Sequence, residues 1–115
     1  MELIRGVHNL RPRHAGCVAT IGNFDGLHRG HGAIVEAVME EARRRHEKAA
    51  VMLFEPQPVE FFAPDKAPPR LMTLRDKLRA LEQLEVDQVL CARFDDRFRS
   101  RSAHDFVQQL LVDGL

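Results

Sequence analysis

Three short apolar segments alternate with segments of helical periodicity, and this alternation limits the folds that the chain can adopt. The apolar segments are CVATI (17–21), AAVMLF (49–54) and QVLCA (88–92). Their length and composition are typical of buried strands. Strands that alternate with helices pair in parallel. We therefore predict an α/β fold with a parallel sheet and, because crossovers are right-handed, with helices on both faces of that sheet.

The segments between and after these strands carry apolar stripes that are typical of amphipathic helices. The first stripe consists of Ile34, Val35, Val38, Met39 and Ala42. A second helix is predicted after Thr73, because Thr73 and Asp76 have the T-x-x-D form of a capping box. A third helix is predicted after Ser102, and its apolar stripe consists of Phe106, Val107, Leu110 and Leu111.

Two further segments complete the predicted organisation. Residues 3–7 (LIRGV) are predicted to form a short edge strand. Residues 55–72 contain five prolines and are predicted to form a long loop, which in a compact domain is often functional. Since no strand follows the last predicted helix, we expect the chain to be the front portion of a longer domain.

The charge balance excludes the strongly basic class of nucleic-acid-binding domains. Lys plus Arg and Asp plus Glu both number 17, so the net charge is zero. Cys17 and Cys91 are too few for a disulfide framework and are expected to be reduced thiols. The sequence shows no signal-peptide pattern and no window of the ~18 apolar residues that a membrane span needs. We expect a cytoplasmic protein with no nucleic-acid or membrane partner.

The stretch GNFDGLHRGH (22–31) joins the first long strand to the first helix. In parallel α/β sheets, ligands bind outside the carboxyl ends of the strands. Glycines let backbone N–H groups approach a ligand closely, and a helix N-terminus adds a partial positive charge. The stretch therefore predicts an anion site, for which phosphate is the natural ligand.

Two histidines within this stretch suggest what the site does with a phosphate. His28 and His31 are three residues apart and share one face of a helix that begins near His28. Each can donate a hydrogen bond to a phosphoryl oxygen, and phosphoryl transfer depends mainly on positioning and charge stabilisation. Two alternatives remain open: a glycine-rich turn with surface histidines, and a metal site with Asp25, His28 and His31 as ligands. The spacing excludes a Walker-type loop.

These residues resemble the G-x-F-D-G-x-H-x-G-H motif of the HxGH nucleotidyltransferases. Within that superfamily, Gly26 after the Phe-Asp pair is similar to the bacterial bifunctional riboflavin kinase/FAD synthetases. A second segment, FEPQP (54–58), resembles the F-D-P-H-P segment of the same family, with Glu55 and Gln57 in place of Asp and His. The likeness covers nearly the whole chain and implies a Rossmann-like nucleotidyltransferase fold.

The resemblance also implies an activity and a set of site residues. It implies transfer of AMP from ATP to FMN in the presence of Mg²⁺, giving FAD and pyrophosphate, within a family that also phosphorylates riboflavin. Residues 1–115 would be the N-terminal portion of the adenylyltransferase domain, without the riboflavin kinase domain. His28 and His31 would be catalytic, with no protein metal ligand. The nucleotide pocket would be formed by Gly22, Asn23, Phe24, Asp25, Gly26 and Gly30.

The resemblance to the family also implies which residues line the flavin side of the site. By the same resemblance, Pro56, Pro58 and Phe62 would line it. The alternative is that the prolines form a rigid linker and that Phe61 and Phe62 pack as a satellite core. Two alternatives also remain for the function, namely a non-catalytic nucleotide-binding fragment of such an enzyme and another HxGH nucleotidyltransferase.

Overall fold

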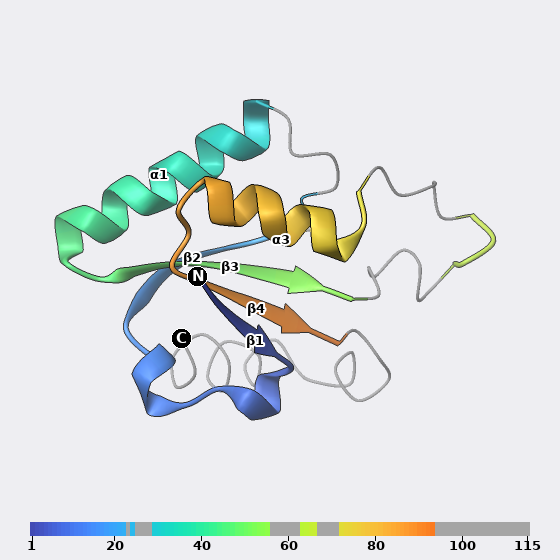
Figure 1. The fold of residues 1–115 in the computed structure, drawn as a ribbon, viewed down its shortest axis with the longest axis horizontal. Helices are drawn as coiled ribbons and strands as arrows, with labels where there is room; N and C mark the ends of the chain where they lie inside the picture. The colour runs from blue at the N-terminus through green and yellow to red at the C-terminus, as the bar shows by residue number, and fades with distance from the viewer. Residues whose placement is uncertain (23, 25–28, 56–62, 67–71, 94–115) are drawn as a thin grey trace.

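The strands of the protein form a parallel sheet, which a computed structural model describes together with the helices that cover it (Figure 1). The structure describes residues 1–22, 24, 29–55, 63–66 and 72–93. Its strands are β1 (Glu2–Arg5), β2 (Cys17–Ile21), β3 (Lys48–Phe54) and β4 (Gln88–Ala92). Its α-helices are α1 (Arg29–Arg45) and α3 (Leu74–Gln83), and two 3-10 helices, η1 (Val7–Asn9) and η2 (Pro12–His14), follow β1.

The sheet has the strand order β1-β4-β3-β2, and each neighbouring pair is parallel. The prediction of a parallel α/β sheet is therefore confirmed. β3 lies in the middle of the described sheet, and its residues Ala49, Ala50, Val51, Met52 and Leu53 are all at most 2% exposed. Such a continuous apolar run is typical of a parallel strand that is covered on both faces.

Alternate residues of the strands face two separate hydrophobic clusters. Val51, Leu53 and Val89 belong to one cluster, whereas Met52 and Leu90 belong to the other. The register is consistent with this division, because Val51 pairs with Val89 and Met52 pairs with Leu90. Successive side chains of a strand point to opposite faces, so the two clusters lie on the two faces of the sheet.

Helices α1 and α3 both pack on the first of these faces (Figure 1). Val35 of α1 and Leu81 of α3 are fully buried there, as their apolar stripes predict, whereas Ile34, which the sequence analysis placed in the stripe of α1, is 46% exposed. The Thr73 hydroxyl accepts a hydrogen bond from the Asp76 N–H at 3.1 Å, so the predicted cap of α3 is confirmed. On the second face, Val7 and Leu10 pack against the cluster of Met52 and Leu90. The helix predicted after Ser102 lies outside the described residues.

The N-terminal strand is shorter than the sequence predicts and starts earlier. It spans Glu2–Arg5 and lies at an outer position of the described sheet, next to β4. Gly6 ends it because the φ of this residue is 85°, a left-handed value that glycine adopts without steric cost. Val7, which the sequence analysis placed in the strand, instead begins η1.

A buried histidine connects this N-terminal segment to the sheet. The side chain of His14 is 1% exposed, and its Nδ1 accepts a hydrogen bond from the Arg11 N–H at 2.8 Å. The Nε2 of the neutral ring therefore carries the proton, and it lies 3.0 Å from Glu2 Oε2. The His14 carbonyl accepts a hydrogen bond from Gln88 Nε2 at 3.0 Å. One residue thus links η2 to both β1 and β4.

The His14 ring and the Arg13 guanidinium lower the pKa of Glu2 from 4.5 to about 2. A carboxylate whose pKa is depressed in the folded state raises the free energy of unfolding at pH values above its ordinary pKa. This stabilisation is lost as the pH falls from the ordinary pKa through the pKa of the folded state. We predict that Glu2→Gln lowers the urea midpoint near neutral pH. The difference from wild type should shrink between pH 4.5 and about pH 2.

The matched control for this experiment is Glu82→Gln, which removes an exposed carboxylate from α3. We expect it to leave the urea midpoint nearly unchanged across the same pH range. A stability difference between Glu2→Gln and wild type that is equal at neutral and acidic pH would contradict the assigned role of the Glu2 carboxylate.

Candidate functional site at the carboxyl edge of the sheet

The candidate site lies where β2 ends and α1 begins. All described strands run in the same direction, so their carboxyl ends share one edge of the sheet. β2 ends at Ile21 and α1 begins at Arg29, which places the N-terminus of α1 at this edge. The first turn of α1 contains no acidic residue. The N–H groups at the start of a helix and the positive end of its dipole favour an anion, as the sequence predicts.

The predicted site residues fall partly inside and partly outside the described residues. The backbones of Gly30 and His31 lie in the first turn of α1, which is the position that the sequence analysis gives them. Gly22 and Phe24 are described in full. The remaining predicted residues lie outside the described residues, and their roles stay predictions; they are Asn23, Asp25, Gly26, His28, Pro56, Pro58 and Phe62.

Phe24 anchors the start of the loop between β2 and α1. Its side chain is 3% exposed and belongs to the hydrophobic cluster that includes Val35 and Leu53. The φ of Phe24 is 51°, which is uncommon for a residue other than glycine, asparagine or aspartate. The sequence analysis assigned Phe24 to the nucleotide pocket, and the structure places its ring in the core. The packed ring fixes the point at which the chain leaves the sheet.

A side chain at position 22 would clash with the Phe24 ring, so glycine is required there. Its N–H donates a hydrogen bond to the Met52 carbonyl at 3.1 Å, so it continues the pairing of β2 with β3. A Cβ atom at Gly22 would lie 2.9 Å from Cε2 of the Phe24 ring. A side chain at position 22 would therefore displace the ring and, with it, the loop. The sequence indicates that this glycine matters but does not reveal its contact with Phe24.

Lys77 of α3 is a buried residue that sequence reasoning missed. It is 2% exposed, although it is a lysine on a helix. The available signal was its position in the apolar stripe of α3, three residues after Leu74 and four before Leu81. A charged residue at such a position is either buried or directed along the edge of the stripe, and the sequence does not distinguish these outcomes.

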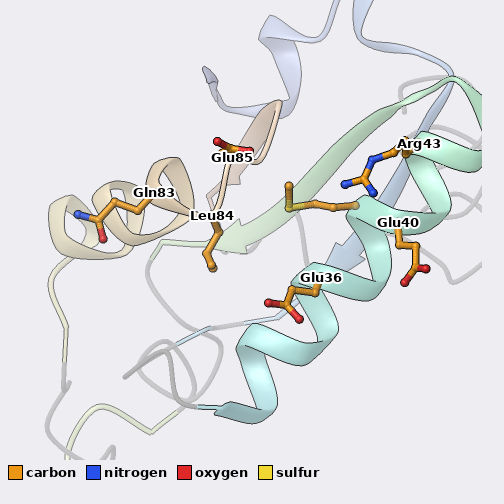
Figure 2. Close-up of a pocket in the computed structure, with 7 residues that line it drawn as sticks. Glu36, Glu40, Arg43, Gln83, Leu84 and Glu85 are labelled. Carbon is orange, nitrogen blue, oxygen red and sulfur yellow. The ribbon is translucent and has the colours of Figure 1, made fainter.

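A groove on the helical face lies away from the candidate site and has the wrong charge for a nucleotide (Figure 2). It measures about 530 Å³ and lies between α1 and the C-terminal end of α3. Met39 and Leu84 supply its apolar lining, and its charged lining residues are Glu36, Glu40, Glu85 and Arg43. Three carboxylates and one guanidinium repel a polyphosphate.

Two other classes of site receive no support from the part of the chain that is described. Within residues 1–22, 24, 29–55, 63–66 and 72–93, no three His, Cys, Asp or Glu side chains are grouped to hold a metal ion. The metal site considered for Asp25, His28 and His31 lies outside the described side chains. In the same described part, no helix combines the length and the apolar character needed to cross a bilayer.

The parallel sheet and the helix N-terminus at its carboxyl edge define a Rossmann-like α/β fold. A solved structure described as a macrolide-efflux protein from Streptococcus pneumoniae shares this fold with a TM-score of 0.74 and 21% identity. The similarity covers 93% of this chain and 36% of that one.

A family model described as FAD synthetase matches residues 10–115, and the chain belongs to this family. The bifunctional riboflavin kinase/FMN adenylyltransferase of Escherichia coli K12 is 57% identical to it over 116 residues. The enzyme of the same description from Pseudomonas fluorescens is 55% identical over 115 residues. Each match covers 100% of this chain, and the chain spans 37% of the length of these relatives. The resemblance inferred from the two sequence motifs is confirmed.

The contact between Gly22 and Phe24 generates a stability prediction. Gly22→Ala should destabilise the fold by about 1–3 kcal/mol, because the added methyl group overpacks the site against the ring. The control is Gly32→Ala in α1, where an added Cβ meets nothing within 4 Å. This variant should be more stable than wild type by about 0.5–1 kcal/mol, since alanine favours the helix. Urea denaturation measures both, and equal effects of the two substitutions would refute the steric account.

Proposed function

We propose that this chain is the ATP-binding portion of an FMN adenylyltransferase, which transfers AMP from ATP to FMN. The observation that carries the proposal is the family match to residues 10–115, a range that includes β2, the glycine–histidine loop and α1. The geometry supports it, because the loop meets the sheet at the carboxyl edge, where the N-terminus of α1 favours an anion.

The proposed reaction is a displacement at the α-phosphorus of ATP. A phosphate oxygen of FMN forms a bond to this phosphorus, and the bond from the phosphorus to the oxygen that bridges to the β-phosphate breaks. The products are FAD and pyrophosphate. The nucleophile is already an anion, so the protein has no need for a serine or cysteine nucleophile. Its task is to align the reactants and to stabilise the charge on the equatorial oxygens.

Each part of the loop has a proposed role in this task. The N–H groups in the first turn of α1, which includes Gly30 and His31, are proposed to donate to the triphosphate. The imidazoles of His28 and His31 are proposed to donate to phosphoryl oxygens of the transition state. Gly22, Asn23, Asp25 and Gly26 are proposed to shape the nucleotide pocket, with Phe24 anchoring it. Pro56, Pro58 and Phe62 are proposed to line the flavin side.

A divalent cation, proposed to be Mg²⁺, belongs to the substrate in this account. Mg²⁺ usually retains several waters and binds through substrate phosphates together with one or two carboxylates. It would neutralise part of the charge of the triphosphate.

The state of the two cysteines bears on the proposed location of the protein. Cys17 and Cys91 form no disulfide, and burial raises the pKa of the Cys17 thiol, so this thiol is largely protonated at neutral pH. Two free thiols fit the proposed location in the cytoplasm.

A second candidate function follows from the share of the relatives that the chain covers. The chain spans 37% of their length, so it is alternatively a nucleotide-binding segment that has no adenylyltransferase activity by itself. Riboflavin kinase activity is part of the description of the relatives and is not proposed for these residues.

One assay separates the two candidates. The chain is incubated with FMN, ATP and Mg²⁺, and FAD is measured by chromatography, beside a version extended beyond Leu115. FAD from both proteins supports the adenylyltransferase. FAD from the extended version alone, with ATP binding by both, supports the nucleotide-binding segment. If neither protein binds ATP or produces FAD, the proposed function is wrong.

Substitution of the histidines tests the site itself. We predict that His28→Ala and His31→Ala each lower FAD formation by the extended protein by about 100-fold, as loss of one oxyanion donor does. The matched control is His8→Ala, which removes an exposed histidine of η1 and should leave the rate unchanged. A rate within twofold of wild type in both loop variants would show that the histidines do not serve the reaction.

A further inference from the structure

The groove between α1 and the C-terminal end of α3 is a surface that the proposed reaction does not use. Its lining residues lie in the second half of α1 and at the end of α3, whereas the candidate site lies at the start of α1. Its volume of about 530 Å³ falls within the range of ligand pockets. The groove therefore has the size of a binding site and a location of its own.

The floor of the groove is apolar. Met39 and Leu84 line it, and both are half-buried residues that pack against the first hydrophobic cluster. An apolar group that lies on these two side chains leaves water, and the hydrophobic effect favours this transfer. The groove thus offers an apolar anchor point at the border of the core.

The rim of the groove carries charged groups that are available to a partner. They are Glu36, Glu40, Glu85 and Arg43, so three carboxylates and one guanidinium give the groove a net charge of −2. Within the described part of the chain, none of these side chains forms an ion pair, although Glu41 of the same helix pairs with Arg44 and Arg45. A cationic partner can therefore reach these carboxylates without breaking an existing pair there.

The two walls of the groove bring these groups to the same space. Glu36 and Arg43 extend from α1 toward the end of α3 (Figure 2). Leu84 and Glu85 lie on the other side, where α3 ends. An occupant of the groove would meet a carboxylate on each wall, with the apolar floor between them.

The charge and the floor together select among the possible occupants. A polyphosphate, a nucleic acid or an acidic membrane surface is repelled by the net charge of −2. A second copy of the chain that presents the same groove would bring like charges together. A small organic polycation would pair with the carboxylates and leave Met39 and Leu84 uncovered. A peptide with apolar side chains between basic ones satisfies both the rim and the floor.

We propose that this groove is the docking surface for a basic amphipathic peptide segment of a partner protein. An apolar side chain of the segment packs on Met39 and Leu84. Its lysine or arginine side chains pair with Glu36 on one wall and with Glu85 on the other, and the Arg43 guanidinium donates to a carbonyl of its backbone. This inference goes beyond the proposed function and does not depend on it, because none of these residues belongs to the candidate site.

The backbone at Glu85 makes this carboxylate a suitable one to remove. The Glu85 N–H donates to the Glu82 carbonyl at 3.0 Å, and the Val86 N–H donates to the Leu81 carbonyl at 3.3 Å. These two bonds are those of a Schellman motif, in which the residue at position 85 takes a left-handed conformation that favours glycine. The φ of Glu85 is 67°, so Glu85→Gly removes the carboxylate at a position where glycine fits the backbone.

The end of α1 supplies a matched control. The His46 N–H donates to the Arg43 carbonyl at 3.2 Å, and the Glu47 N–H donates to the Ala42 carbonyl at 2.8 Å, so the same motif is present there. The φ of His46 is 56°, and this exposed residue does not line the groove. His46→Gly therefore makes the same change of backbone preference without a change in the groove.

The probe is a synthetic peptide, Lys-Lys-Leu-Ala-Lys-Leu-Phe-Lys-Lys-Leu, with blocked ends, and calorimetry at low ionic strength measures its affinity. We expect it to bind wild type and His46→Gly equally, and Glu85→Gly about fivefold more weakly, as loss of an exposed ion pair does. Addition of Glu36→Gln to Glu85→Gly should bring the loss to about 25-fold, because the two carboxylates lie on opposite walls and act independently.

Two further ligands test the chemistry of the occupant. The first is the same peptide with serine in place of leucine and phenylalanine, and the second is spermidine. Both should bind more weakly than the probe, since neither covers Met39 and Leu84. In amide NMR, the probe should shift the resonances of Glu36, Met39 and Glu85 most strongly.

The remaining outcomes contradict the proposal. Wild type that does not bind the probe, or equal binding of the probe by wild type and by Glu85→Gly, shows that the groove does not dock a basic segment. Equal losses in Glu85→Gly and His46→Gly assign the effect to the backbone and not to the carboxylate. Spermidine that binds as tightly as the probe assigns the groove to small organic cations. No step involves ATP or FMN, so the result is separate from the outcome for the proposed function.

Discussion

The parallel pairing of β3 with β2 on one side and β4 on the other determines where the other elements of the protein can lie. Val51 pairs with Thr20 of β2 and with Val89 of β4, so the three strands are held in one register. Parallel strands need crossovers, and α1 and α3 supply them on one face of the sheet. Because every crossover starts at the carboxyl edge, the N-terminal ends of both helices gather there.

Charge is distributed unequally between the two ends of α1. Its first turn contains no acidic residue, whereas its last turn contains Arg43, Arg44 and Arg45. Arg44 and Arg45 pair with Glu41, and these contacts lower the pKa of Glu41 to about 2. Basic residues at the C-terminus complement the helix dipole, and the absence of acids in the first turn leaves the dipole free to attract an anion. The first turn of α1 therefore attracts a phosphate, whereas the groove near Glu85 is lined by three glutamates and repels one.

The sequence predicted what depends on local pattern, and it missed what depends on contacts between distant residues. The strands at 17–21 and 88–92, the cap at Thr73 and the burial of Val35 in α1 follow from periodicity and capping chemistry. By contrast, the contact between Glu2 and His14 and the burial of Lys77 arise only when separate elements meet. No spacing rule predicts them. In the site, the position of the loop could be predicted, and the packing of Phe24 in the core could not.

In the function proposed here, the first turn of α1 and the loop before it form the phosphate site. Backbone amide NMR of the chain during titration with Mg·ATP tests it most directly, because every residue reports separately. We expect the largest chemical-shift changes in residues 22–33, with little change at Glu40, Arg43 and Glu85 in the groove. Changes centred on the groove, or a spectrum that does not respond to Mg·ATP, would show that the phosphate site lies elsewhere or is absent.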